Sequence, residues 1–219
     1  CNGALIIDKG GKEVVPTGTY FSLYRAGTDI IASKVTKAGL KYGILDVNLK
    51  EKTEFTYDSI SYVNGVYTYT DGNSVGLINE DGKKIYTYKL TDNDNKVIDV
   101  TPCKVTKDNY QRYGVVKVNT TSLIVNLKDG NAVYSPTLNE IVPEENNVFY
   151  ELRDNGKKRY IYVQDNKVLV ESEDYNSLSI SSIDSHLKYF FILLLIDSNS
   201  SSYHFLLDWI YSSSKLKPS

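Results

Sequence analysis

The stretch Val75-Gly76-Leu77-Ile78-Asn79-Glu80-Asp81-Gly82-Lys83-Lys84-Ile85 decides the fold class of this chain. It places two short runs of β-formers on either side of a polar corner, Asp81-Gly82. Val and Ile fit a pleated, half-buried surface, and glycine adopts positive φ without steric cost. An Asp-Gly corner between such runs favours a type I′ turn. The stretch therefore predicts a β-hairpin with Gly82 at positive φ.

The same motif recurs along the chain. It consists of an apolar or aromatic residue, a glycine, two or three β-formers and a polar turn. Its glycines lie 33 to 40 residues apart, a spacing typical of repeat proteins. We therefore expect an all-β protein of tandem, hairpin-rich repeats, which could form a stacked array or a propeller-like ring. The copies are Gly3–Asp8, Tyr42–Asp46, Val75–Asn79 and Tyr113–Lys117, with a weaker one at Tyr160–Val163.

Local signals between the copies agree with this interpretation. In Val66-Tyr67-Thr68-Tyr69-Thr70 the tyrosines alternate with other residues, as they do in a strand with two different faces. Strand formers are abundant, with 19 tyrosines in the chain. Further hairpin corners are expected at Asn64-Gly65, Asp71-Gly72, Asp129-Gly130 and Asn155-Gly156.

The composition changes near residue 172, which divides the chain into a repeat region, 1–171, and an irregular closing unit with a tail, 172–219. Repeat arrays need an atypical end that covers the last exposed face. The run Tyr189–Ile196 is the most apolar part of this unit. It is far shorter than the ~20 residues of a transmembrane helix, so we expect a buried strand or a short core helix.

Charge and cysteine content narrow the function classes. The formal net charge is −2, and positive and negative residues are dispersed along the chain. Because a nucleic-acid binder usually carries a basic stripe, we expect no nucleic-acid partner. Cys1 and Cys103 do not make a disulfide framework or a zinc site, and Cys103 is expected to be a buried thiol. Cys1 has two interpretations: the lipid-bearing first residue of a mature bacterial lipoprotein, or simply the point where the sequence starts.

No catalytic, metal or cofactor motif stands out. His204 has Asp208 at i+4, but no Gly-x-Ser-x-Gly elbow accompanies it or His186, and both histidines are expected to be structural. The acidic clusters Asp92–Asn95 and Glu171–Asp174 are expected to be solvated turns, because the first lacks the Gly and distal Glu of an EF-hand. Paired carboxylates of a glycoside hydrolase stay open, since their separation is a three-dimensional quantity.

Four tyrosines offer the one positive functional signal. Tyr67, Tyr69, Tyr86 and Tyr88 could form a ladder on one face of neighbouring strands. An exposed ladder would present flat, amphipathic area suited to sugar rings or to a protein partner. The competing interpretation is that they are half-buried cross-strand pairs that stabilise the sheet.

The repeated motifs resemble those of the WG (KWG) repeat family of bacterial proteins. The clearest match is Lys41–Asp46, followed by Tyr57–Ile60 and Gly65–Tyr69, and the first copy matches through Gly3–Pro16. The resemblance is weak beyond Tyr134, and the family's Trp is replaced in every copy. The replacing residues are Asn2, Tyr42, Val75 and Tyr113. The family is a structural label, so the resemblance implies a binding or scaffold role without catalytic residues.

These features together predict a non-enzymatic binding or scaffold module of the bacterial cell envelope, without cofactor or metal, that engages a protein or polysaccharide partner. Contact with a membrane is expected only through a lipid on Cys1. A hydrolase with dispersed carboxylates, a spacer without a ligand and a cytoplasmic location are the alternatives. An exposed, contiguous aromatic patch would separate the binding module from the spacer.

Overall fold

The computed structural model describes residues 3–7, 9–92, 94–95, 97–106, 112–175, 179–180 and 193–194. The regular structure of these residues is entirely β, with nineteen strands and no helix. The predicted all-β fold class is confirmed. Since no helix occurs among the described residues, none is long and apolar enough to cross a membrane.

Strands that follow one another in the chain pair antiparallel to form five consecutive sheets, named here I to V. Sheet I holds β1 (Ala4–Ile7) and β2 (Glu13–Tyr20), and sheet II holds β3 (Ser22–Ala26), β4 (Asp29–Thr36) and β5 (Gly39–Leu45). Sheet III holds β6 (Ser59–Val63), β7 (Val66–Asp71), β8 (Ser74–Ile78) and β9 (Lys84–Lys89). Sheet IV holds β10 (Ile98–Pro102), β11 (Tyr113–Val118), β12 (Thr121–Asn126) and β13 (Ala132–Thr137).

Sheet V holds β14 (Ile141–Pro143), β15 (Val148–Leu152), β16 (Lys158–Gln164) and β17 (Lys167–Tyr175). β17 runs past residue 171, and the division of the chain at that point stays a prediction. A further two-residue pair joins β18 (Ser179–Ile180) to β19 (Leu193–Leu194), which lies in the predicted apolar run. The rest of the predicted closing unit lies outside the described residues.

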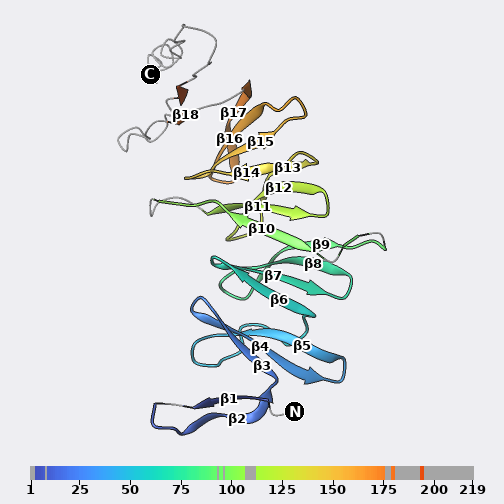
Figure 1. Ribbon diagram of the computed structural model, residues 1–219, viewed down its shortest axis with the longest axis vertical. Helices are drawn as coiled ribbons and strands as arrows, with labels where there is room; N and C mark the ends of the chain where they lie inside the picture. The colour runs from blue at the N-terminus through green and yellow to red at the C-terminus, as the bar shows by residue number, and fades with distance from the viewer. Residues whose placement is uncertain are drawn as a thin grey trace, which may run out of the picture.

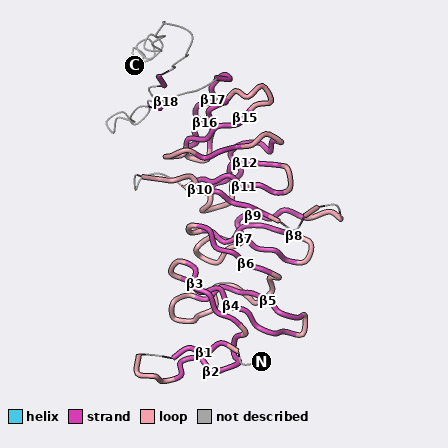
Figure 2. Tube along the Cα trace, viewed as in Figure 1, coloured by secondary structure: helices cyan, strands magenta, loops and turns pink. Residues whose placement is uncertain are grey.

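The five sheets are stacked in chain order along the longest axis of the molecule, with sheet I at one end and sheet V near the other (Figure 1). Each layer of the stack contains several strands joined by turns at its margins (Figure 2). The observed arrangement of the described strands is therefore the stacked array and not the propeller-like ring.

Apolar side chains fill the space between consecutive sheets, so the core consists of layers. The I–II layer is formed by Val15, Tyr20, Ala32 and Leu45. The II–III layer is formed by Ala26, Ile31, Ile44, Tyr57, Ile60, Tyr67, Tyr69 and Ile78. The III–IV layer includes Val66, Leu77, Val100, Val116 and Val125, and the IV–V layer includes Tyr113, Ile124, Phe149 and Ile161.

The period of two along a strand explains how one sheet serves two layers. On β7, Val66 faces the III–IV layer, whereas its neighbour Tyr67 faces the II–III layer. Because both faces of an inner sheet are covered, its strands are apolar at consecutive positions instead of alternating. The first four residues of β7 and the last four of β8 are all buried for this reason.

The Asp81-Gly82 corner lies in a five-residue turn between β8 and β9 rather than in a two-residue one. The Asn79 side-chain oxygen Oδ1 accepts hydrogen bonds from the backbone N–H groups of Asp81 (3.1 Å) and Lys83 (3.0 Å). Gly82 has φ +82°, as predicted, but Asp81 is not at positive φ, so the type I′ assignment there is wrong. An Asx side chain that satisfies two backbone donors has replaced the second positive φ. Asn64-Gly65 does have positive φ at both residues.

The same five-residue turn follows β5, where Asp46 Oδ1 accepts from the N–H groups of Asn48 (2.8 Å) and Lys50 (2.9 Å). The chain then returns alongside β5 as an irregular fourth strand of sheet II, through isolated bridges from Leu45 to Glu51 and from Tyr42 to Tyr57. Sheets II and III thus share one plan of four successive strands, with the five-residue turn between the third and the fourth.

Candidate functional site

The four tyrosines of the predicted ladder lie on opposite faces of sheet III. Tyr67 and Tyr69 are each 1% exposed in the II–III layer, whereas Tyr86 and Tyr88 are partly buried against the III–IV layer. The expected single-face ladder is wrong because of strand register. Tyr69 is paired with Gly76, but Tyr86 and Tyr88 are paired with the adjacent, oppositely facing positions Leu77 and Val75.

Tyr69 holds sheets II and III together. Its hydroxyl lies 2.7 Å from Thr87 Oγ1, and its ring centroid lies 5.0 Å from that of Tyr57. Lys84 Nζ lies over both rings, 4.8 Å from the Tyr57 centroid and 4.7 Å from the Tyr69 centroid. Tyr69 is therefore packed between sheets II and III, and its ring has no exposed surface that could contact a ligand. A ligand-binding role for Tyr86 and Tyr88 stays a prediction.

A buried polar cluster joins the same two sheets. The Asp29 carboxylate is 5% exposed, and its Oδ2 accepts hydrogen bonds from Lys52 Nζ (2.6 Å) and the Tyr67 hydroxyl (2.8 Å). Lys52 Nζ also donates to the backbone oxygen of Glu80 in sheet III. Burial raises the pKa of Tyr67, and the hydrogen bond to Asp29 raises it further. The cluster is therefore a fully paired connection between sheets.

Glu151 forms a second connection, between sheets IV and V. It is 2% exposed, and its carboxylate accepts four hydrogen bonds, from Thr137 Oγ1 (2.8 Å), Asn139 Nδ2 (2.9 Å), Arg153 Nη1 (2.9 Å) and the Tyr134 hydroxyl (3.1 Å). Burial alone would raise the pKa of this carboxyl, but these donors together hold it below its ordinary value. A carboxylate bonded in this way is unsuited to proton transfer.

Cys103 is buried, as predicted, at the IV–V layer. Its Sγ accepts a hydrogen bond from the backbone N–H of Asn147 at 3.2 Å. Burial raises the pKa of the thiol to about 11, despite that hydrogen bond. Cys1, His186 and His204 lie outside the described residues. Within the described part of the chain, no group of three or more His, Cys, Asp or Glu side chains could hold a metal ion.

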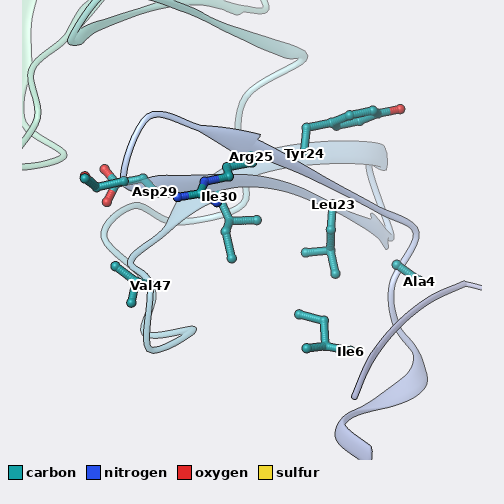
Figure 3. A pocket seen from close by; sticks show the side chains of 9 residues that line it. Ala4, Ile6, Leu23, Tyr24, Arg25, Asp29, Ile30 and Val47 are labelled. Carbon is teal, nitrogen blue, oxygen red and sulfur yellow. The ribbon is translucent and has the colours of Figure 1, made fainter. Parts of the chain in front are cut away.

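An apolar groove of about 700 Å³ lies between β1 and the β3–β4 hairpin. Figure 3 shows Leu23 and Ile30 of sheet II pointing toward Ile6 of β1 across this space, with Val47 at one side. Arg25 and Asp29 line it at the hairpin end. Sequence reasoning missed the groove because it depends on how β1 packs beside the β3–β4 hairpin, which no local pattern reveals.

Exposed apolar side chains gather around the same end of the stack. Of the eleven large ones that are exposed in the described part of the chain, seven lie within the first 47 residues, which form only two of the five sheets. Val47, which lines the groove, is 66% exposed, and Tyr24 of the same hairpin, whose ring points away from the groove in Figure 3, is 61% exposed. The seven are Ile7, Val14, Phe21, Tyr24, Val35, Leu40 and Val47. Such a concentration marks interaction surfaces more often than single exposed residues do.

No family model matches the sequence, and no curated protein matches it either. Among solved structures, the WD40 domain of SCAP from fission yeast is similar at 11% identity and a TM-score of 0.33, over 70% of this chain and 43% of that one. Apo AztD from Citrobacter koseri is similar at 10% identity and a TM-score of 0.36, over 84% and 64%.

The WD40 domain of Pan2 from Neurospora crassa is similar at 12% identity and a TM-score of 0.29, over 80% of this chain and 60% of that one. This chain therefore spans less than two thirds of the length of each of these three structures. TM-scores below 0.5 do not establish a shared overall arrangement.

Proposed function

We propose that this chain is a non-enzymatic binding module that engages a protein partner at the sheet I–II end of its stack. The observation that carries the proposal is the concentration of exposed apolar side chains in sheets I and II, which also hold the groove between β1 and the β3–β4 hairpin. Transfer of such side chains out of water upon binding is favourable by about 25 cal/mol per Å². A linear stack of sheets suits a scaffold, because its successive layers can each contact a different partner.

A protein is favoured over a polysaccharide because of the kind of surface present. The groove presents mainly aliphatic side chains, including Ile6, Leu23, Ile30 and Val47. Sugar rings are usually bound by flat, exposed aromatic faces. The rings of Tyr67 and Tyr69 are buried, so they cannot contact a sugar. The paired state of Asp29, Glu151 and Cys103 supports a non-enzymatic role, since each is used to connect sheets.

The resemblance to the WG repeat family of bacterial proteins supports a binding or scaffold role for this module, here placed in the bacterial cell envelope. This placement and the family membership are part of the proposal. Fractionation of the producing cells, with the chain detected by antibody and Cys1 analysed for a lipid by mass spectrometry, tests the placement. Recovery in the soluble fraction with an unmodified Cys1 would contradict the envelope assignment.

A retention experiment tests the binding proposal. The chain is immobilised and exposed separately to cell extract and to purified cell-wall polysaccharide, beside a Tyr24→Ser/Val47→Ser variant. A matched Leu138→Ser/Leu169→Ser variant removes equally exposed apolar side chains from sheets IV and V. We expect one protein to be retained by the wild type and by the matched variant but lost from the first. Retention of polysaccharide alone, or release of sugar from it, would reject the proposal in favour of the carbohydrate alternatives.

A further inference from the structure

The turn between β14 and β15 carries a buried asparagine that its backbone conformation does not require. Asn146 and Asn147 are both at positive φ, +52° and +66°. Asparagine tolerates this conformation, but glycine adopts it without steric cost, and the corner Asn64-Gly65 has glycine in second place. Backbone conformation alone therefore does not account for an amide at position 147.

Both polar atoms of the Asn147 side chain, Oδ1 and Nδ2, lack a hydrogen-bond partner among the described residues, and the residue is 0% exposed. Its backbone groups are paired. The N–H donates to Cys103 Sγ at 3.2 Å, and the oxygen accepts from the N–H of Val163 at 3.1 Å. Buried polar groups are almost always hydrogen-bonded, because an unpaired one loses its hydration without compensation. The enclosed amide thus points to a bound molecule.

Other asparagines at positive φ in sheet V use their amides to reach sheet IV or the segment beside it. Asn146 Oδ1 accepts hydrogen bonds from the N–H and the Oγ1 of Thr106, which follows β10, both at 2.9 Å. Asn166, in the turn between β16 and β17, accepts at its Oδ1 from Asn126 Nδ2 at 2.7 Å. By analogy, Asn147 would make such a connection through an intervening molecule.

Backbone oxygens gather beside Asn147, around the Cys103 thiol. The Sγ atom lies 3.3 Å from the oxygen of Glu144 and 3.9 Å from those of Lys104 and Val148. A carbonyl oxygen has two lone pairs, so it can accept a second hydrogen bond. The surroundings of the amide therefore offer acceptors to a small molecule that donates more than one hydrogen bond.

We propose that Asn147 binds an internal water molecule beside Cys103, at the margin of the IV–V layer. Water is the smallest molecule that both donates and accepts, so it can donate to Oδ1 or accept from Nδ2 and direct its other hydrogen bonds to the nearby backbone oxygens. A cation would suit only Oδ1, and an anion only Nδ2. This site is independent of the proposed binding function, and it adds a polar connection between sheets IV and V.

Water–protein NMR on the whole chain, labelled with nitrogen-15, tests the site without any substitution. We expect cross-relaxation between water and the side-chain NH₂ of Asn147, with laboratory-frame and rotating-frame Overhauser effects of opposite sign, because a bound water tumbles with the protein. Asn79 is the matched control within the same chain. It is 7% exposed, its Oδ1 accepts from two backbone N–H groups, and its Nδ2 donates to the backbone oxygen of Lys128 at 3.1 Å. Its NH₂ should show no such signal.

A variant separates water from a hydroxyl proton that exchanges with water. Thr106→Val removes the hydroxyl that bonds the neighbouring Asn146, and the Asn147 signal should persist in it. Absence of a signal at Asn147, an equal signal at Asn79, or loss of the signal in Thr106→Val would overturn the site. None of these outcomes depends on a substitution of Asn147 itself.

Counting internal waters by oxygen-17 relaxation dispersion gives a second readout. Asn147→Leu replaces the amide by an apolar group of similar size, and it should hold about one internal water fewer than the wild type. Asn64→Leu places the same residue at positive φ in an exposed corner, and its count should equal that of the wild type. An unchanged count in folded Asn147→Leu would overturn the proposal. If that variant fails to fold, the signal of the wild-type amide still decides.

Discussion

The Tyr67 hydroxyl donates a hydrogen bond of 2.8 Å to the carboxylate of Asp29, although the two residues are 38 positions apart in the chain. Tyr67 belongs to β7 of sheet III, and Asp29 begins β4 of sheet II. The bond therefore joins two successive layers of the stack at a point where both groups are buried. In a protein whose units contact only their neighbours, such bonds decide how firmly one unit is coupled to the next.

Tyr67→Phe should lower the free energy of unfolding by about 2 kcal/mol, since a hydrogen bond to a charged group is lost from a buried site. Lys52 remains to pair with Asp29, which limits the loss. Urea unfolding at neutral pH measures the change. Tyr24→Phe is the control, because its ring is 61% exposed, and it should alter stability by less than about 0.5 kcal/mol. Equal effects of the two substitutions would contradict the role of the Tyr67–Asp29 bond.

Glu151 should make stability depend on pH in the acid range. Its pKa in the folded state is below the ordinary value of 4.5, so its contribution is fully present above that value. The contribution is lost as the pH falls through the lowered pKa and the carboxylate becomes protonated. Glu151→Gln should cost about 3 kcal/mol near pH 7, because Arg153 loses its buried partner. In paired unfolding curves this difference should shrink steadily below pH 4.5; a constant difference down to pH 2 would refute it.

Cys103 should be almost unreactive in the folded protein. With the thiol pKa raised to about 11, only about a thousandth of it is thiolate at pH 8, against roughly a quarter for an ordinary cysteine. Reaction with Ellman's reagent should therefore be at least about 200-fold slower than in guanidinium, and burial should slow it further. The measurement is made on Cys1→Ser, so that only one thiol reports. Rapid labelling without denaturant would show that the IV–V layer opens readily.

Gly82→Ala and Gly11→Ala separate backbone strain from steric contact. Both glycines have nearly the same positive φ in equivalent turns, so both substitutions carry a left-handed penalty of about 1 to 2 kcal/mol. A Cβ at Gly82 would lie 2.7 Å from the backbone oxygen of Lys52, whereas one at Gly11 would have no neighbour within 4 Å. Gly82→Ala should therefore lower the melting temperature clearly more than Gly11→Ala, and Gly82→Val more again. Equal shifts would mean that the contact with Lys52 is relieved without cost.

The amino-acid sequence by itself determined the local structure. Corners such as Asn64-Gly65 and the Asn79–Lys83 turn, flanked by short runs of β-formers, specify hairpins through contacts within a few residues. The all-β class and the tandem repetition follow from the same short-range signals, and so does the positive φ of Gly82. These features could be predicted because turn chemistry and strand period are properties of adjacent residues.

The sequence could not assign faces or register. Alternation states that Tyr67 and Thr68 point in opposite directions, but an inner sheet is apolar on both faces, so nothing local indicates which layer receives Tyr67. The predicted single-face ladder of tyrosines is wrong for this reason. The pairing of Tyr86 with Leu77 is set by the register between β8 and β9, which the sequence does not reveal.

Only the tertiary structure decided the polar connections and the candidate site. Asp29 meets Tyr67, and Glu151 meets Tyr134 and Thr137, because stacking brings distant sheets into contact. The groove is formed where β1 packs beside the β3–β4 hairpin, so it brings together Ile6, Leu23 and Ile30 from two different sheets. Hairpins form by local interactions, whereas the faces that they bury and the edges that they leave open depend on which sheets lie next to them.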